Sequence, residues 1–292
     1  MLAFWISIAL LSVAQGALVA IPRRVPAKRL SYLRGRRWAL VPPLSVIGFV
    51  LVARAAEHAS AQGLTYLALC AVPPLAALAL GWLSRGARPA RALLVLPLFA
   101  LAWADRGGLA GEAAAVALSA LSCVTLAVVL ASVTPPRWLA AGIFAMAVAD
   151  TALVVSDLLR RPNDALNAAH PAAGLPRLQS AVLGSAVMGY GDLFVAALLG
   201  ALLAVLGGSS LQRRGAALTA FLALAFDLLF FFVDELPATV PVALALLAVA
   251  LRRSRTHARK LPPAPYGAAR ASSRAPPVSA RRGAAGTSPP PP

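Results

Sequence analysis

Three acidic residues lie deep inside apolar stretches of the sequence, where ionisable groups are rare: Asp150, Asp192 and Asp227. Removing a carboxyl group from water is costly, so such residues are candidates for function by default. Asp150 and Asp192 are each the thirteenth residue of a consecutive apolar stretch, 138–159 and 180–206. Because consecutive spanning helices run antiparallel, the equal depth predicts that the two carboxyls meet near the middle of their helices.

Two carboxyls that face each other at close range share one proton, because both cannot ionise cheaply. The ionised member of such a pair can take a proton from a bound water. The protonated member can hydrogen-bond a substrate carbonyl and later help to expel the amine. This chemistry cleaves a peptide bond, and we therefore expect Asp150 and Asp192 to be a catalytic pair.

The residues before the second acid form a Gly-x-Gly-Asp sequence, made of Gly189, Tyr190, Gly191 and Asp192. Glycines remove side chains where another backbone must come close. They would shape the surroundings of the acid, although a close helix crossing beside an incidental acid would give the same pattern.

A third motif opens the last apolar stretch, 236–251, where Pro237 and Ala238 precede Thr239. Proline near the first turn of a helix is common. Two prolines and two small residues within six positions also predict a stretch of irregular backbone. An extended substrate could pair with that stretch.

The composition indicates which elements must hold these residues. Apolar residues make up 60% of the 292 positions and charged residues 13%, whereas soluble domains average about 45–50% and about 25%. A bilayer-spanning helix needs about 20 mainly apolar residues. The sequence therefore predicts an all-α, polytopic membrane protein with nine transmembrane helices, and the first is not a cleavable signal peptide. The nine stretches are 2–21, 38–54, 63–83, 92–105, 113–133, 138–159, 180–206, 216–233 and 236–251.

The basic residues predict the orientation of the nine stretches. Alternating them across the membrane divides the 27 lysines and arginines into 22 on one side and 5 on the other. Loops rich in these residues stay in the cytoplasm. We thus expect the N-terminus outside and the C-terminus in the cytoplasm. The scarcity of lysine among the bases, together with abundant alanine, favours a GC-rich genome and a bacterial plasma membrane.

The chain divides into three parts on this interpretation. Residues 1–137 form a five-helix membrane part, 138–251 a four-helix part with the candidate catalytic motifs, and 252–292 a basic, Pro/Ala-rich tail that should be disordered. The tail is expected to be a solubilising segment that begins with a stop-transfer cluster of basic residues, and a contact with anionic lipid is the alternative. Topology accounts for the net charge of +17, so no nucleic-acid partner is expected.

The order of these motifs resembles the presenilin and signal peptide peptidase family of intramembrane aspartyl proteases. That family has nine spans, with catalytic aspartates on the sixth and seventh and a Pro-Ala-Leu motif opening the ninth. The resemblance implies that Asp150 and Asp192 are the catalytic pair and that Pro237 and Ala238 shape the substrate site. It implies transmembrane segments or remnant signal peptides as substrates. The motifs cover 138–251, and the earlier part matches by span count alone.

Some residues depart from the family pattern. Ala149 stands where the family has tyrosine, and Thr239 where it has leucine. Asp157, seven residues after Asp150 and on the same expected helical face, is a rival for the first aspartate. Asp227 has no role in the scheme; it would pair with a neighbouring polar group or belong to a proton or ion path.

Other protease classes fit less well. The prepilin peptidases also use Gly-x-Gly-Asp, but their motif continues with a Lys-Leu-like pair where this chain has Leu193 and Phe194. Rhomboid-like serine proteases need an intramembrane histidine, and the three histidines lie outside the predicted spans. The His-Glu-x-x-His motif of zinc proteases is absent.

Two further classes remain open: a non-catalytic relative whose acids only pack, and a multi-pass transporter coupled to protons or ions. The sequence contains no internal repeat, and this counts against the transporter. No cofactor or metal is expected, since Cys70 and Cys123 sit in apolar stretches without a metal-ligand spacing. The oligomeric state cannot be predicted from these residues.

Overall fold

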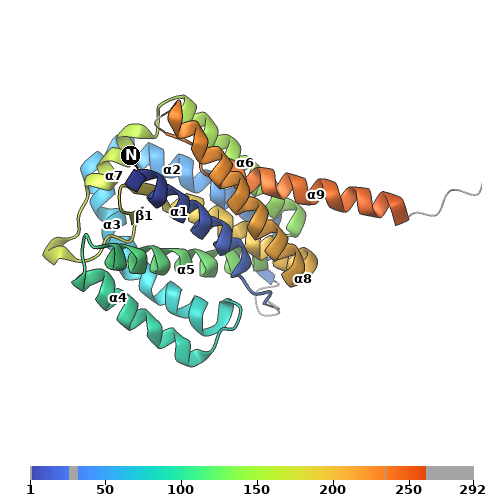
Figure 1. The fold of residues 1–292 in the computed structure, drawn as a ribbon, viewed down its shortest axis with the longest axis horizontal. Coiled ribbons are helices and arrows are strands. Elements are labelled where there is room, and N and C mark those ends of the chain that lie inside the picture. The colour runs from blue at the N-terminus through green and yellow to red at the C-terminus, as the bar shows by residue number, and fades with distance from the viewer. Residues whose placement is uncertain (1, 26–31, 234, 261–292) are drawn as a thin grey trace, which may run out of the picture. The chain divides into compact units, whose positions relative to one another are not determined.

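The computed structural model describes residues 2–25, 32–233 and 235–260; the side chains of residues 57, 58, 173 and 254–260 are not described. Two compact units divide the chain, Met1–Ala250 and Leu251–Pro292. Helices dominate the first (Figure 1). The described α-helices are α1 (Leu2–Ala20), α2 (Val41–Ala55), α3 (Glu57–Leu78), α4 (Val95–Ala104), α5 (Leu109–Val133), α6 (Pro136–Val155), α7 (Arg160–Ala168), α8 (Tyr190–Asp227) and α9 (Val240–Lys260). Shorter helical turns are η2 (Arg36–Leu40), η3 (Ala79–Leu83), η4 (Pro89–Leu94), η5 (Ala172–Gly174) and η6 (Leu228–Phe231).

Among the described residues, six helical segments are long and apolar enough to cross a membrane. Such segments are typical of an integral membrane protein. The six are Leu2–Ala20, Arg36–Ala55, Ala59–Leu83, Leu109–Val133, Pro136–Val155 and Tyr190–Phe231, and Pro89–Ala104 is a shorter apolar helix. In α9 the apolar run ends at Leu251, after about 18 Å of helix.

The longest segment is two helices joined by a turn. Gly208 has φ 67° and ψ −156°, which interrupts α8 with a conformation that side chains disfavour. The two halves then fold back on each other, because Gln212 in the second half donates a 2.8 Å hydrogen bond to the carbonyl of Gly200 in the first.

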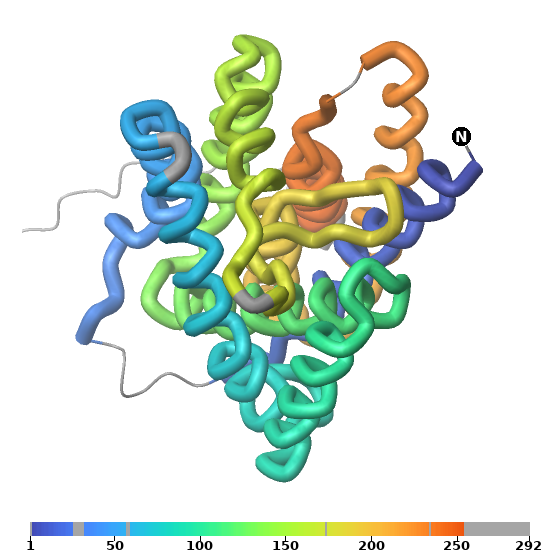
Figure 2. The backbone as a smooth tube through the Cα atoms, turned by 90° about the vertical axis from the view of Figure 1, so that its left-hand side faces the viewer, coloured from blue at the N-terminus to red at the C-terminus, as the bar shows by residue number. Residues whose placement is uncertain are grey.

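The prediction of a continuous seventh helix over 180–206 is wrong in its first ten residues. These form an antiparallel hairpin of β1 (Ser180–Leu183) and β2 (Ala186–Gly189), in which Ser180 pairs with Gly189. Figure 2 shows the hairpin in yellow; β1 packs against α5 and β2 against α1. The all-α prediction therefore misses one small sheet, which leads directly into α8.

The predicted tail also needs correction at its start. Residues 252–260 continue α9 as helix instead of beginning an irregular segment. The rest of the predicted disordered tail, 261–292, lies outside the described residues.

The loops between helices gather at two ends of the first unit. At one, which we call the arginine end, the segments 21–25 and 84–88 and the turn at Gly207–Gly208 lie together: the Arg23 N–H donates to the carbonyl of Leu83 at 2.8 Å. At the other, which we call the acidic end, the segments 105–112, 157–184 and 235–237 lie together.

The acidic end is held by polar contacts between distant segments. Glu112 accepts a 2.6 Å hydrogen bond from the Gly184 N–H at the tip of the hairpin. Asn163 of α7 donates to Glu235 at 2.9 Å. These contacts fix the connection before α8 and the connection before α9 at the same end as the start of α5.

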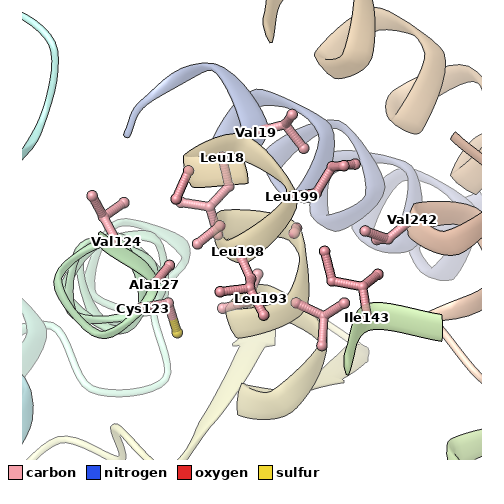
Figure 3. Close-up of a cluster of buried hydrophobic side chains, with 14 of the residues drawn as sticks. Leu18, Val19, Cys123, Val124, Ala127, Ile143, Leu193, Leu198, Leu199 and Val242 are labelled. Carbon is pink, nitrogen blue, oxygen red and sulfur yellow. The ribbon is translucent and has the colours of Figure 1, made fainter. Parts of the chain in front are cut away.

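The core holds α8 against four other helices. Figure 3 shows Leu18 and Val19 of α1, Cys123, Val124 and Ala127 of α5, Ile143 of α6, Leu193, Leu198 and Leu199 of α8, and Val242 of α9 converging in one cluster. Small residues bring α1 and α8 together, since a Cβ at Gly200 would lie 2.9 Å from the Cα of Val19. Close backbone approach of this kind is how helices associate in lipid.

Candidate active site

Asp192 lies in the first turn of α8, not in the middle of a helix as the sequence predicted. Its Oδ2 accepts a 3.1 Å hydrogen bond from the Gly189 N–H, which satisfies one of the free backbone donors at a helix start. The next residue, Leu193, is fully buried in the core cluster. The acid therefore stands at a fixed point, where the hairpin becomes a helix.

Tyr190 fastens the start of α8 to α5. Ser122 donates its hydroxyl proton to the carbonyl of Ser119 at 2.6 Å, so the Tyr190 hydroxyl, 2.6 Å from the Ser122 oxygen, acts as the donor to Ser122. The Cys123 thiol lies 3.7 Å from the Tyr190 carbonyl. Tyr190 thus positions Asp192, which follows it by two residues.

The two glycines of the motif do not mark a close backbone crossing. A Cβ at Gly191 would meet only the Cε of Met146, at 3.5 Å, which is an ordinary contact. A Cβ at Gly189 would lie 3.0 Å from the carboxyl oxygen of Asp192. The glycines instead keep side chains away from the carboxyl and from the neighbouring face of α6.

Asp150 projects from α6 one turn after Met146, the residue that faces Gly191. It is 8% exposed and lies five residues before the end of α6, about 7.5 Å along the helix. Asp150 and Asp192 also line the same cavity. The two acids are therefore neighbours, nearer the acidic ends of their helices than the mid-helix depth that the sequence predicted.

The third motif reaches the first acid directly. The hydroxyl of Thr239, which is fully buried, donates a 2.6 Å hydrogen bond to Oδ2 of Asp150. Residues 235–237 have no regular secondary structure, and α9 begins at Val240. Pro237 and Ala238 thus lie in the irregular stretch expected of them, next to Asp150.

Two polar residues of α1 support this region, and sequence analysis missed both. Gln15 donates a 2.9 Å hydrogen bond to the carbonyl of Ala238. Ser12, one turn away, donates a 2.7 Å hydrogen bond to Oδ2 of Asp227. Both side chains are 1% exposed. Their spacing of three residues within an apolar helix places them on one face, which was a readable signal.

A cavity of about 1420 Å³ joins these groups. Asp150, Asp192 and Asp227 line it, as do Pro237 and Ala238. At the acidic end its lining includes Asp157, Arg160, Asp164 and Glu235, and along its length it includes apolar residues of α2, α3 and α5. A long, mainly apolar cavity with a few convergent polar groups has the character of a binding site.

Asp157 is displaced from its predicted position. Helix α6 ends at Val155, and Asp157 follows in a turn with φ 53°. Its side chain is exposed at the cavity's acidic end and does not share a helical face with Asp150. Asp157 therefore lacks the shared helical face on which its rival assignment rested.

Within the part of the chain that the structure describes, no group of three or more histidine, cysteine, aspartate or glutamate side chains is placed to hold a metal ion. Comparisons with models of protein families, with curated proteins and with solved structures find no match to this chain.

Proposed function

We propose that this chain is an intramembrane aspartyl protease, a distant member of the presenilin and signal peptide peptidase family. One observation carries the proposal: Asp150 and Asp192, from different helices, line one cavity, and Met146, one turn before Asp150, faces the glycine that precedes Asp192. The hydrogen bond from Thr239 to Asp150 supports it, because it brings the third motif into direct contact with the pair.

In the proposed reaction the two carboxyls share one proton. The ionised carboxyl accepts a proton from a water molecule, whose oxygen attacks the scissile carbonyl carbon. The protonated carboxyl donates to the carbonyl oxygen, giving a tetrahedral intermediate. The carboxyl that took the proton from water then donates it to the nitrogen, while the other carboxylate takes a proton back from a hydroxyl of the intermediate. The C–N bond breaks, an acid and an amine leave, and the pair again shares one proton. Thr239 donates to Oδ2 of Asp150, which lines the cavity, and so restrains this carboxyl.

The substrate is proposed to lie extended beside the pair. A transmembrane helix must unwind locally, since its peptide bonds are otherwise protected by hydrogen bonds. Val187, Met188 and Gly189 of β2 line the cavity, and β2 pairs with β1 along one edge. We propose that the substrate adds as a strand at the other edge of β2. We propose transmembrane segments, including remnant signal peptides, as the substrate class.

The proposal includes nine spans in a bacterial plasma membrane. The two halves of α8 count separately across Gly208, and the shorter segments Pro89–Ala104 and the apolar part of α9 complete the number. The arginine end would lie in the cytoplasm and the acidic end outside, following the distribution of basic residues. The site would then open near the outer surface.

A proton- or ion-coupled transporter is the second candidate. It is favoured by six acidic side chains along one cavity, with Arg160 the one basic side chain in that described lining. The acids are Asp150, Asp157, Asp164, Asp192, Asp227 and Glu235. Such a series could pass protons or cations.

Cleavage by the purified protein in vesicles, with a panel of doubly tagged transmembrane peptides, tests the proposal. Asp150→Asn and Asp192→Asn should each lower turnover by about a hundredfold or more, and the double variant should be no worse. Asparagine is the substitution of choice at position 192, because its carbonyl can still accept from the Gly189 N–H. Asp164→Asn is the matched control: it lines the same cavity and should keep cleavage.

The pH profile of turnover should be bell-shaped, because one carboxyl must be ionised and the other protonated. Cleavage that persists in both single variants would overturn the protease, and cation flux through the same vesicles would then test the transporter. A well-folded wild type that cleaves no peptide of the panel would favour a non-catalytic relative.

A further inference from the structure

A second pocket, of about 590 Å³, lies at the arginine end, away from the carboxyl pair. Its lining includes three arginines, Arg23, Arg24 and Arg85. The other described lining residues are Gly86, Ala87, Ala204, Val205, Leu206, Gly207 and Gly208, so no acidic side chain takes part in it. Three like charges around one hollow repel each other unless an anion lies between them.

The backbone fixes two of these arginines side by side. Pro22 and Ser84 form an antiparallel bridge, with hydrogen bonds from the Arg23 N–H to Leu83 and from the Arg85 N–H to Ile21 at 2.9 Å. The residues next to a bridged pair point to the same face of the two strands. Arg23 and Arg85 are therefore diagonal neighbours, about 7–8 Å apart by Cα, which is within reach of one ligand.

The buried amide of Gln212 holds the Arg85 guanidinium in place. The Arg85 guanidinium donates to Oε1 of Gln212. Gln212 is fully buried, and its Nε2 donates to the carbonyl of Pro22 at 2.9 Å and to that of Gly200 at 2.8 Å. One side chain thus links Arg85, the bridge and both halves of α8. The guanidinium is prepositioned, which lowers the entropy lost when it binds a ligand.

The helical part of the lining has a different character. It consists of Ala204, Val205 and Leu206 at the end of the first half of α8, and Leu206 is 37% exposed. A ligand that fits both parts of the lining carries an anionic group and aliphatic carbon. Guanidinium groups bind phosphate oxygens with well-directed, charge-assisted hydrogen bonds.

We propose that this pocket binds the phosphate group of an anionic phospholipid, with Arg23, Arg24 and Arg85 on the phosphate and Leu206 against the start of an acyl chain. The site lies where α1, η3 and the first half of α8 end, which is the depth of lipid headgroups for a spanning bundle. It does not depend on the carboxyl pair or on cleavage. It is also distinct from the basic residues after Leu251.

The test measures binding of short-chain phosphatidylglycerol to the full chain in detergent by native mass spectrometry. The pocket variant is Arg23→Gln/Arg24→Gln/Arg85→Gln. Its matched control is Arg34→Gln/Arg36→Gln/Arg37→Gln, which removes the same charge from a neighbouring segment that does not line the pocket. The pocket variant should lose about tenfold or more in affinity, and the control less than about threefold.

Further binding measurements distinguish an anionic phospholipid from free phosphate as the ligand. Zwitterionic phosphatidylcholine should bind more weakly than phosphatidylglycerol, and equal binding would overturn an anionic site. Inorganic phosphate that competes at millimolar concentration, with the same dependence on the three arginines, would support the phosphate site and make free phosphate its ligand. Equal losses in both triple variants, or no loss in either, would overturn the proposal. If the triple variant does not fold, Arg23→Gln/Arg24→Gln keeps the Arg85–Gln212 contact and should still lose about threefold or more.

Discussion

The hydroxyl of Thr239 donates a 2.6 Å hydrogen bond to the carboxyl of Asp150, across 89 residues of sequence. Thr239 is the position at which this chain departs from the Pro-Ala-Leu motif of the proposed family. A leucine could make no such bond. Thr239 therefore gives Asp150 a polar contact that the leucine of the motif could not supply.

Replacing Thr239 by valine should impair cleavage while preserving side-chain shape. A hydrogen bond to a charged group contributes about 1.5–3 kcal/mol, so turnover should fall by about tenfold to a hundredfold. Thr239→Ser keeps the hydroxyl and should retain most activity. Turnover and its pH profile, measured for both variants, check this. Equal losses in the two variants would mean that the methyl group matters and the hydrogen bond does not.

Gln15 should act on the reaction through the backbone of the third motif. Gln15→Leu leaves the Ala238 carbonyl without its 2.9 Å partner and loosens the turn that presents Thr239. We expect turnover to fall by about threefold to tenfold with little change in KM, as one lost hydrogen bond predicts. In a double-mutant cycle, Gln15→Leu should add little to Thr239→Val, because both act on one contact. Full additivity would show that Gln15 acts elsewhere.

Sequence reasoning identified the acids and the Pro-Ala stretch because each breaks the apolar pattern of a span. The presence of several long apolar helices is confirmed. The depth of Asp192 was wrong for a physical reason. Residues 180–189 are nearly as apolar as the segments of the membrane-spanning helices. Hydropathy cannot distinguish a β-hairpin from a helix in such a stretch.

Contacts between distant segments could not be predicted from one sequence. Thr239 was read only as a deviation, because its partner lies on another helix. Ser12 and Gln15 were readable as a polar pair on one face of α1, but their partners, Asp227 and the Ala238 carbonyl, follow from the packing of α1 on α8 and from the turn before α9.

The two ends of the first unit should lie on opposite sides of the membrane. In a background with Cys70→Ala and Cys123→Ala, single cysteines are placed by Arg88→Cys at the arginine end and Arg106→Cys at the acidic end. An impermeant maleimide added to intact cells should label the Arg106→Cys variant and spare the other, whereas permeabilised cells should label both. Labelling of Arg88→Cys in intact cells would reverse the proposed orientation.

Alanine substitutions at two glycines, one at the α1–α8 crossing and one in α3, should have opposite effects on the free energy of unfolding. Gly200→Ala places a Cβ 2.9 Å from the Cα of Val19, so the helices must separate. We expect a loss of about 1–3 kcal/mol in the free energy of unfolding, as for other overpacked cores. In α3, a Cβ at Gly63 meets nothing within 4 Å, and Gly63→Ala should gain about 0.5–1 kcal/mol. Unfolding in mixed micelles measures both. A neutral Gly200→Ala would mean that this crossing is wrong.

Asp227 distinguishes the two proposed functions most directly. Its carboxyl accepts a hydrogen bond from the Ser12 hydroxyl, and the residue lines the cavity. The described hydrogen bond of Thr239 goes to Asp150 and not to Asp227. In a protease Asp227 is structural, so Asp227→Asn, which can still accept from Ser12, should keep cleavage within about threefold. Ser12→Ala, which removes only the partner, should do the same.

In a transporter the ionisable carboxyl itself is needed, so Asp227→Asn should stop cation-coupled flux while Ser12→Ala reduces it only partly. Cleavage lost in Asp227→Asn but kept in Ser12→Ala would place this third carboxyl in the proton transfers of the protease.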